Sequence, residues 1–406
     1  MRKGLFKNEA ANENHKHWKK LIKRLRSLYS RPKDIRSEFI RDYNRILHCT
    51  AYRRLKHKTQ VFFAPKNDHI CTRIEHVNHV TSVSYIIAKF MGLNTELATA
   101  IALGHDLGHA PFGHPGEDIL KEITQKELGF EFWHEKNSLR FVDYLETLKD
   151  PEGFEQNLNL TYAVRDGIVC HCGEVDQKTI KPRKEFIDLE EIEKATHPDP
   201  ITWEGCVVKI ADKIAYLGRD MEDAITLEIL SEDQVKELED IVKPYIDFGG
   251  STLNTTVIMH EFIIDLCENS NPDDGLKLSD EKYELMKKIK DFNYNNIYLH
   301  PRIKEYKEYA RLIINTIYNK LKENYEGKNI LKKVEKMKNY YPILGKVFSE
   351  WLRKYMKSND RPQKYRNKPL YDLENEKDYS QCIVDFISGM TDMFAIQVFG
   401  ELTSFL

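Results

Sequence analysis

The stretch ALGHDLGHAPFGHPGE, residues 102–117, holds three histidines, one aspartate and one glutamate within sixteen residues. A hydrophobic core has little use for such side chains, because each buried polar group without a partner costs roughly 1 to 3 kcal/mol. Imidazoles and carboxylates bind divalent cations and also donate and accept protons. The stretch therefore predicts a functional site.

The adjacent residues His105 and Asp106 are the first candidates for metal binding. Neighbours on a helix differ by about 100 degrees around its axis, so both contact one ion only if it lies beside the helix end. Further ligand candidates are His76 and Asp212, although His76 taken alone is equally typical of a core histidine. Two imidazoles and two carboxylates favour Mn²⁺ or Mg²⁺, with Fe²⁺ or Zn²⁺ as alternatives, and leave positions open for water or substrate.

The composition is that of a globular protein without a general attraction to polyanions. Charged residues make up 31% of the chain and hydrophobic residues 41%, and the formal net charge is −2. The sequence contains no run of 18 apolar residues and no apolar segment after the first methionine. We therefore expect a cytoplasmic protein that does not contact a membrane.

The seven cysteines are scattered along the chain, which is typical of reduced thiols. Cys170 and Cys172 flank His171 and so suggest a zinc site. No second Cys or His pair follows at the spacing of a zinc finger, so we do not expect structural zinc there.

Helical periodicity dominates, and strand signals are few and short. A helix is predicted from Val77 to Met91, stopped by a glycine, and the next begins at Asn94 or Thr95 and reaches Asp106. Pro111 and Pro115 then predict a loop that leads into a new helix at about Glu117. Further helices are expected at 135–148, 161–170, 206–230, 233–242, 253–267 and 306–325, with exposed loops at 267–280 and 357–378.

The basic segment 15–33 carries Trp18, Leu21, Leu25 and Leu28 at helical spacing. A solvated helix face explains its charges, and an arm that contacts phosphate or another subunit is the alternative. The apolar stripe predicts a short helix that something must cover, either this chain or a second copy.

Several motifs together resemble the HD-domain phosphohydrolases, and specifically the deoxyguanosine triphosphate triphosphohydrolase (dGTPase) branch. RIEH (73–76), GHDLGHAPFGHPGE (104–117) and ADKIAY (211–216) occur in the order typical of that branch. RILHCTAYRRLKHKTQVF (45–62) and VDFISGMTDMFAIQVF (384–399) are similar to two further family segments. The bare His-Asp doublet is a weak signal, but the full HDLGHAPFGHPGE string is specific.

The resemblance covers residues of about 40–230 and 380–400, and residues 235–375 show little that matches. It implies an all-α fold with an HD-domain helical core and a helical C-terminal lobe. We expect an N-terminal arm and the start of the core at 1–60, the catalytic core at 61–235, and the lobe at 236–406. The last segment of the lobe, about 380–400, is expected to pack back on the core.

The resemblance also implies roles for individual residues. The metal ligands would be His76, His105, Asp106 and Asp212. His114 would be the general acid or base, and Glu117 would hold its ring. The residues that contact phosphate would be Arg73, His109, His134 and Lys213. The residues that contact the sugar would be Gln60, Tyr216 and Asp220, with Tyr216 closing the space that a 2'-hydroxyl needs.

The reaction that the resemblance implies converts a dNTP and water into a deoxynucleoside and triphosphate, by attack of a metal-activated water on the α-phosphorus. A preference for dGTP would be inherited from the family. The alternatives are an HD-domain phosphodiesterase or nucleotidase acting on another nucleotide, and a nucleotide or single-stranded nucleic-acid sensor. Relatives also imply a homo-oligomer, with a hexamer slightly favoured, and an allosteric dNTP or single-stranded DNA as a further ligand.

Overall fold

The computed structural model describes residues 3–29, 33–63, 67–172, 177–193, 198–246 and 255–404. Within these ranges the fold is all-α, and its single sheet is the antiparallel pair β1 (Thr147–Lys149) and β2 (Glu155–Asn157). The helices are α1 Trp18–Leu21, α2 Glu38–His48, α3 Thr50–Arg54, α4 Arg73–Met91, α5 Thr95–Gly104, α6 His114–Glu127, α7 His134–Arg140, α8 Tyr162–Val169, α9 Trp203–Thr226, α10 Glu232–Val242, α11 Thr255–Asn269, α12 Asp280–Asn293, α13 Pro301–Lys322, α14 Ile330–Met337, α15 Pro342–Tyr355, α16 Glu376–Ser388 and α17 Asp392–Thr403.

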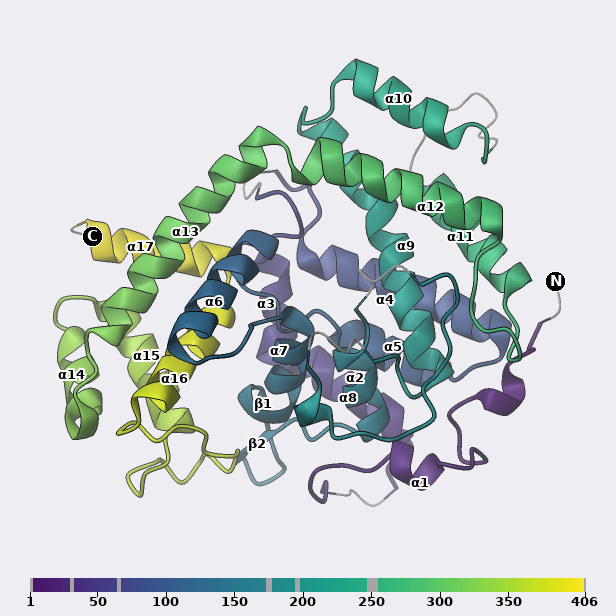
Figure 1. Cartoon of the computed structure of the whole chain (residues 1–406). Helices are drawn as coiled ribbons and strands as arrows, with labels where there is room; N and C mark the ends of the chain where they lie inside the picture. The colour runs from purple at the N-terminus through teal and green to yellow at the C-terminus, as the bar shows by residue number, and fades with distance from the viewer. Residues whose placement is uncertain are drawn as a thin grey trace.

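Helix α5 lies at the centre of the core, in contact with α2, α4, α8 and α9 (Figure 1). Its buried face is built from small residues, so the neighbouring helices approach closely. A β-carbon at Gly104 would lie 2.6 Å from the Ile168 side chain of α8, so a larger residue there would require that side chain to shift. This packing brings the C-terminal end of α5 against α4 and α9.

The predicted end of α4 and the predicted start of α5 are confirmed by their caps, whereas α4 starts at Arg73 rather than Val77 and α5 ends at Gly104 rather than Asp106. Gly92 ends α4 with a φ of 83°, a left-handed conformation that glycine adopts without strain. The Asn94 side chain accepts hydrogen bonds from the backbone N–H groups of Glu96 and Leu97 and so caps α5.

The predicted boundaries of α6 and α7 also differ from the structure. Helix α6 begins at His114 rather than near Glu117, because Pro115 occupies the first turn, where a missing N–H group costs no helical hydrogen bond. The helix predicted at 135–148 ends earlier, since α7 passes into a π-helical turn, Phe141–Leu145, and then into β1.

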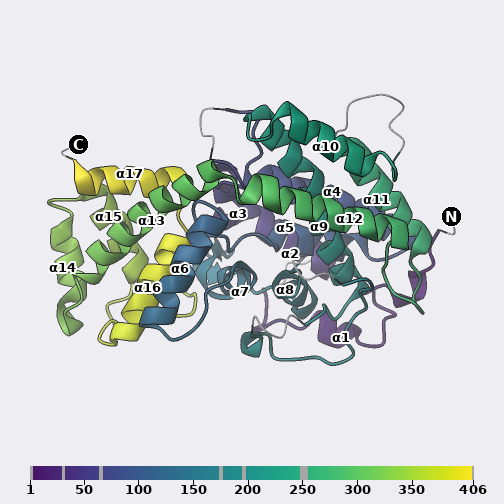
Figure 2. The ribbon, with the colours of Figure 1, turned by 45° about the horizontal axis from the view of Figure 1, so that its top comes forward.

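The C-terminal lobe packs against α6. Helices α13 and α16 both contact α6, and Figure 2 shows α6 lying between them and the core. Asp392, the first residue of α17, hydrogen-bonds to Thr59 and Phe112, which precede α4 and α6 respectively.

The short helix predicted to carry Trp18, Leu21, Leu25 and Leu28 on one face is wrong in its extent, because α1 ends at Leu21. Beyond it the chain is pulled inward by Arg24, whose guanidinium pairs with the fully buried Asp42. Leu21 is buried within the chain and Leu25 is 47% exposed, so they form no continuous apolar face. Trp18 packs edge-on against Phe39 of α2, with ring centroids 5.5 Å apart.

The loop near residue 365 also packs on its own chain. Arg366 stacks over the Phe154 ring at 3.3 Å from its centroid, and its backbone N–H donates to the Glu155 carbonyl of β2. This loop and Trp18 of the basic segment thus both make contacts within the chain, and the homo-oligomer stays a prediction.

Among the described residues, no single helix has the length and apolar character that crossing a membrane requires. Taken together, α16 and α17 reach that length and composition, but they are bent by 118° at their junction.

Candidate active site

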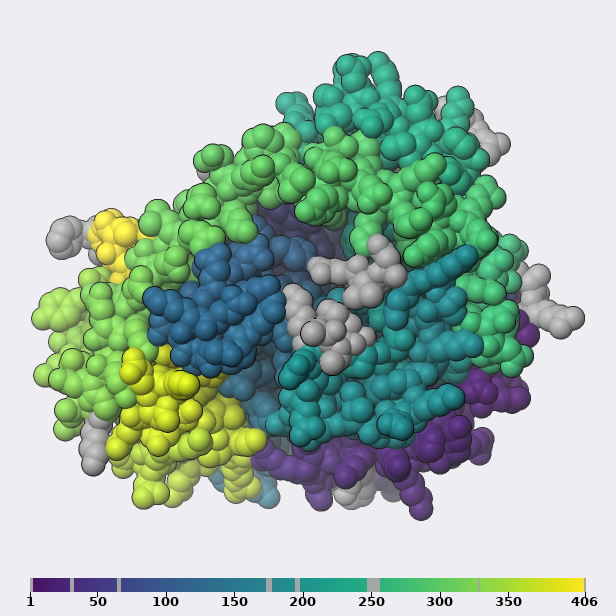
Figure 3. Space-filling view, in the orientation of Figure 1, coloured from purple at the N-terminus to yellow at the C-terminus, as the bar shows by residue number. Residues whose placement is uncertain are grey.

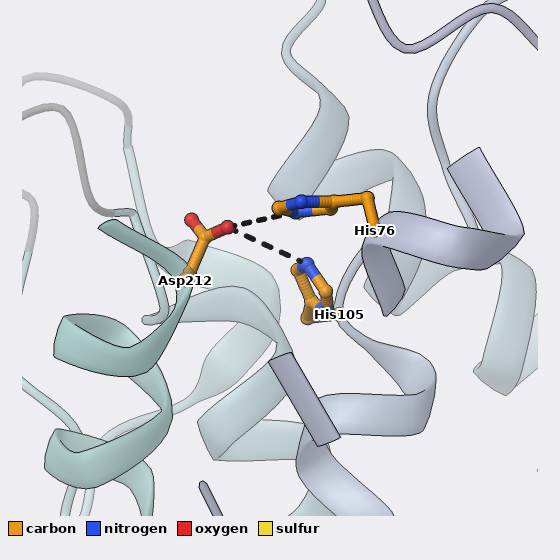
Figure 4. A group of neighbouring side chains, drawn as sticks. All are labelled: His76, His105 and Asp212. Atoms are coloured by element: carbon orange, nitrogen blue, oxygen red, sulfur yellow. Dashed lines mark hydrogen bonds and ion pairs between the residues drawn. The ribbon is translucent and has the colours of Figure 1, made fainter. Parts of the chain in front are cut away.

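Three helices of the core bring their side chains to one point. His76 comes from the first turn of α4, His105 follows the last residue of α5, and Asp212 lies in the middle of α9 (Figure 4). Asp212 Oδ1 lies 2.9 Å from His76 Nε2 and 3.8 Å from His105 Nε2. All three ligand atoms lie within 4.8 Å of one another, a spacing at which one cation can bridge them.

The tautomer of His105 fits a metal ligand. Its Nδ1 lies 2.6 Å from the Ala102 carbonyl oxygen, and this contact requires the proton to be on Nδ1. Nε2 then carries a lone pair, and this atom is buried without a hydrogen-bond partner, 3.4 Å from Asp106 Oδ1. A buried unpaired nitrogen among carboxylate oxygens is unfavourable unless a cation occupies the space. The donor set therefore suits a divalent metal.

Asp106 is held from two sides. Arg73 Nη1 donates to its Oδ2 at 2.8 Å, and His109 Nε2 lies 3.1 Å from its Oδ1. Burial opposes ionisation, but the interactions with His105, His109 and Arg73 outweigh it and hold the pKa of Asp106 well below its ordinary value. Asp106 is thus a carboxylate at neutral pH, as metal binding requires.

Arg73 has more inward contacts than the sequence suggested. Besides Asp106, its guanidinium donates to the carbonyl oxygens of Thr59 and Gln60, and the residue is only 1% exposed. Three of its five donor hydrogens are engaged in these contacts. The role of Arg73 in phosphate binding stays a prediction, and it depends on the two donor hydrogens that these contacts leave over.

Next to this centre, two histidines form a stacked pair. The rings of His109 and His134 are 3.8 Å apart and nearly parallel. Burial disfavours the charged form of His134, but the carboxylates of Glu135 and Glu117 outweigh it and raise the pKa of His134 to about 10. Burial and the charge of Arg73 hold the pKa of His109 well below its ordinary value. One ring is therefore cationic and the other neutral.

Glu117 holds His134 through two hydrogen bonds. Its Oε1 accepts from the His134 backbone N–H at 3.0 Å, and its Oε2 accepts from Nδ1 at 2.9 Å. Burial raises the pKa of the Glu117 carboxyl, but the interactions with the neighbouring imidazoles, that of His134 first, outweigh this effect and lower the pKa below its ordinary value. The structure thus adds His134 to the pair of His114 and Glu117 that the sequence predicted.

His114 lies at the start of α6 and is exposed, unlike the buried His109 and the half-buried His134 beside it. The centroid of its ring is 5.7 Å from that of His109 and 6.4 Å from that of His134. An exposed imidazole beside a buried carboxylate can reach a bound substrate and exchange protons with it. Its role as the general acid stays a prediction.

The residues predicted to contact the sugar lie on α9 and on the segment before α4. Gln60 is buried, and its Oε1 atom has no hydrogen-bond partner, so an acceptor is available there for a ligand. Tyr216 is half-buried one turn beyond Asp212, and Lys213 is buried beside it. Burial raises the pKa of Asp220 to about 7, and its Oδ2 accepts a 2.6 Å hydrogen bond from Tyr298.

Sequence reasoning missed three residues here. His171 was weighed only as a partner of its flanking cysteines, but its ring lies 4.9 Å from that of His105 and 5.7 Å from that of His134. Burial beside the His105 ring lowers the pKa of His171 to about 3, so His171 is neutral. Glu135 could have been assigned to the site because it is adjacent to His134 in the sequence. Nothing in the sequence indicated that Tyr298 lies at the site.

The molecular surface is hollowed on the face where α6 lies near α12 and α13 (Figure 3). Tyr298 follows α12, one of the helices that border this hollow. Its hydrogen bond to Asp220 therefore connects α9 to that helix.

Helical packing and a buried His/Asp centre of this kind define an HD-domain hydrolase, and the model of the HD domain family matches residues 73–217. Three similar proteins are each called a deoxyguanosinetriphosphate triphosphohydrolase-like protein. That of Desulfatibacillum aliphaticivorans is 36% identical over 91% of this chain and 89% of its own length. Those of Caldanaerobacter subterraneus subsp. tengcongensis and Rickettsia bellii are 31% and 32% identical, over 91% and 92% of this chain and 86% and 93% of their own lengths. The chain belongs to this family of deoxyguanosinetriphosphate triphosphohydrolase-like proteins.

Proposed function

We propose that the protein hydrolyses deoxynucleoside triphosphates, with dGTP as the first candidate, to a deoxynucleoside and triphosphate. The observation that carries this proposal is the buried His105 Nε2, which lacks a hydrogen-bond partner and faces the Asp106 and Asp212 carboxylates. The names of the similar proteins supply the substrate class.

The four proposed ligands are His76, His105, Asp106 and Asp212. Their two imidazoles and two carboxylates suit Mn²⁺ or Mg²⁺. A divalent cation bound there would draw charge from a phosphate oxygen and lower the pKa of a water molecule.

The protein's own cations bind the triphosphate in this proposal. His134 is an imidazolium at neutral pH because its pKa is raised to about 10, so it supplies a fixed positive charge beside the centre. Lys213 and the remaining donors of Arg73 add to it, and neutral His109 donates or accepts a hydrogen bond according to its tautomer. Several converging donors are needed because a triphosphate carries more charge than one divalent ion neutralises.

His114 acts as the general acid in this proposal and protonates the departing 5' oxygen. Its exposed position at the start of α6 leaves its ring accessible to a substrate beside the rings of His109 and His134. The carboxylate of Glu117 favours the protonated form of nearby imidazoles, which keeps the proton available for transfer.

The deoxyribose is placed against Tyr216, with the Asp220 carboxyl and Gln60 Oε1 as polar partners. Tyr216 and Asp220 share one face of α9 with Asp212, at spacings of four residues. A side chain packed beneath C2' leaves no room for a 2'-hydroxyl, so deoxy substrates are favoured over ribonucleotides.

The direct test is to incubate the purified protein with each of the four dNTPs, GTP and a cyclic dinucleotide in Mn²⁺ or Mg²⁺, and to identify the products by mass. We expect deoxynucleoside and intact triphosphate from at least one dNTP and neither product from an Asp212→Ala variant. Hydrolysis of the cyclic dinucleotide alone, or release of pyrophosphate, would contradict the proposal.

A further inference from the structure

Asp392 joins the C-terminal lobe to two segments of the candidate active site. It begins α17 within the motif 389–392, and its side chain is 2% exposed. Oδ2 accepts hydrogen bonds from the Thr59 backbone N–H at 2.8 Å and the Thr59 hydroxyl at 2.5 Å. Oδ1 accepts from the Phe112 backbone N–H at 2.8 Å. One buried carboxylate thus satisfies three donors on segments that are distant in sequence.

Lys58 makes the same connection beside it. The lysine is 2% exposed, and its Nζ donates to the Ser388 carbonyl oxygen at the end of α16 and to the His109 carbonyl oxygen. The buried hydrogen bonds of Lys58 and Asp392 therefore tie the junction between α16 and α17 to residues 58–59 and to residues 109–112. Buried contacts of this kind are strong because water does not compete for them.

The first of these segments leads to the metal centre. The carbonyl oxygens of Thr59 and Gln60 accept hydrogen bonds from Arg73, which in turn donates to Asp106. A shift of residues 59–60 would therefore change the direction of the Arg73 guanidinium and of the Asp106 carboxylate.

The second segment leads to His114. Phe112 has a φ of 67°, an uncommon conformation for a bulky residue, and Gly113 follows with a φ of 65°. Such backbone strain costs of order 1 to 3 kcal/mol and persists only where surrounding contacts hold it. The hydrogen bond from Phe112 to Asp392 is one such contact, and the fully buried ring of Phe112 is another, 6.1 Å from that of Tyr306.

We propose that Asp392 is a positioning residue for hydrolysis: it fixes the Arg73–Asp106 pair and the His114 loop relative to each other. This inference rests on the proposed function for its effect on rate. Among the described residues, Asp392 accepts its hydrogen bonds from Thr59 and Phe112 and not from a proposed metal ligand, so its loss should alter the arrangement of the ligands without removing any of them. Misplacement by about 1 Å is enough to reduce a rate on the order of 100-fold.

The test compares Asp392→Asn with Asp42→Asn. The amide in Asp392→Asn keeps the side-chain volume but presents N–H to a backbone or hydroxyl donor, so at least one of the three hydrogen bonds is lost. Asp42 is a matched control because it is also fully buried and also accepts from the backbone N–H and hydroxyl of one threonine, Thr161, away from the site. Both variants should unfold at lower temperature than the parent.

We expect Asp392→Asn to lower kcat for dNTP hydrolysis by roughly 10- to 100-fold, with KM within about threefold, under conditions where both variants are folded. Asp42→Asn should keep the parent kcat. Thr59→Val, which removes only the hydroxyl donor, should lower kcat by a smaller factor than Asp392→Asn does. Thr59→Ser, which keeps the hydroxyl, should have the kcat of the parent. These two variants test the proposal if Asp392→Asn does not fold.

Hydrogen–deuterium exchange of residues 107–114 supplies a measure that does not need activity. We expect faster exchange there in Asp392→Asn, but not in Asp42→Asn. Unchanged exchange would overturn the proposal, as would faster exchange with the parent kcat. If the parent protein hydrolyses no dNTP, the proposed function fails. The positioning role would then be judged by exchange and by Mn²⁺ affinity, which should weaken in Asp392→Asn because Arg73 no longer fixes Asp106.

Discussion

Replacing Glu117 by Gln should move the alkaline limit of activity toward neutral pH. Glu117 and Glu135 together overcome burial and raise the pKa of His134 to about 10. The variant removes one of the two carboxylates, and its amide can donate to His134 Nδ1, which favours the neutral ring. An opposite charge at this distance is worth about 1 to 3 pKa units, or roughly 1.4 to 4 kcal/mol. The pKa of His134 should therefore fall to between roughly 7 and 9.

The assay is the pH dependence of kcat/KM for dGTP in Mg²⁺, because this parameter reports the ionisations of the free enzyme. The parent should keep its activity until the pH approaches the pKa of His134, whereas Glu117→Gln should lose activity about one to three pH units earlier. Asp118→Asn is the control, since Asp118 is next in sequence but pairs with Lys307 on the surface. An unchanged alkaline limit in Glu117→Gln, or a limit moved to higher pH, would refute the reasoning that Glu117 keeps His134 charged.

Three further predictions concern the metal, the acid, and stability. His105→Ala should abolish stoichiometric Mn²⁺ binding measured by calorimetry while the protein stays folded, and retained stoichiometric binding would contradict the ligand assignment. His114→Ala should keep the metal yet lose roughly 100- to 10,000-fold in kcat, the scale of general acid catalysis; near-parent turnover would place the acid elsewhere. Burial raises the pKa of Glu204 to about 7, so the folded state holds this proton more tightly than the unfolded state. Its contribution to stability is present below pH 4.5 and is lost as the pH rises through 7, a change of about 3 kcal/mol. Glu204→Gln should therefore flatten the pH dependence of chemical unfolding over that range, and an undiminished slope would count against it.

The sequence predicted the core of the fold because its signals there are local. The glycine after Met91 and the asparagine before Thr95 mark helix ends through their own backbone and side-chain chemistry. The residue types at 105–117 likewise indicate a site by themselves, because so many imidazoles and carboxylates in one short segment have no role in a core. The start of α6 was misplaced because a proline predicts a break in a helix but also fits its first turn.

Other features depend on contacts that no local pattern reveals. His171 joins the site only because α8 packs against α5, and Tyr298 reaches Asp220 only because the turn after α12 meets α9. Helix α12 went unpredicted because Leu285, Ile289 and Phe292 form a narrow apolar stripe among many lysines and acidic residues. The helix in the basic segment is shorter than its apolar pattern indicates, since Arg24 turns inward to pair with Asp42, which is distant in sequence.

Hydrolysis of dGTP in ¹⁸O-labelled water tests the central claim most directly, since it reports which bond is broken. Attack of water on the α-phosphorus places the label in triphosphate and leaves deoxyguanosine unlabelled. We predict that one ¹⁸O atom per turnover appears in triphosphate, in the presence of Mn²⁺ or Mg²⁺ and not after chelation. Label in deoxyguanosine, or products other than deoxyguanosine and triphosphate, would contradict the account.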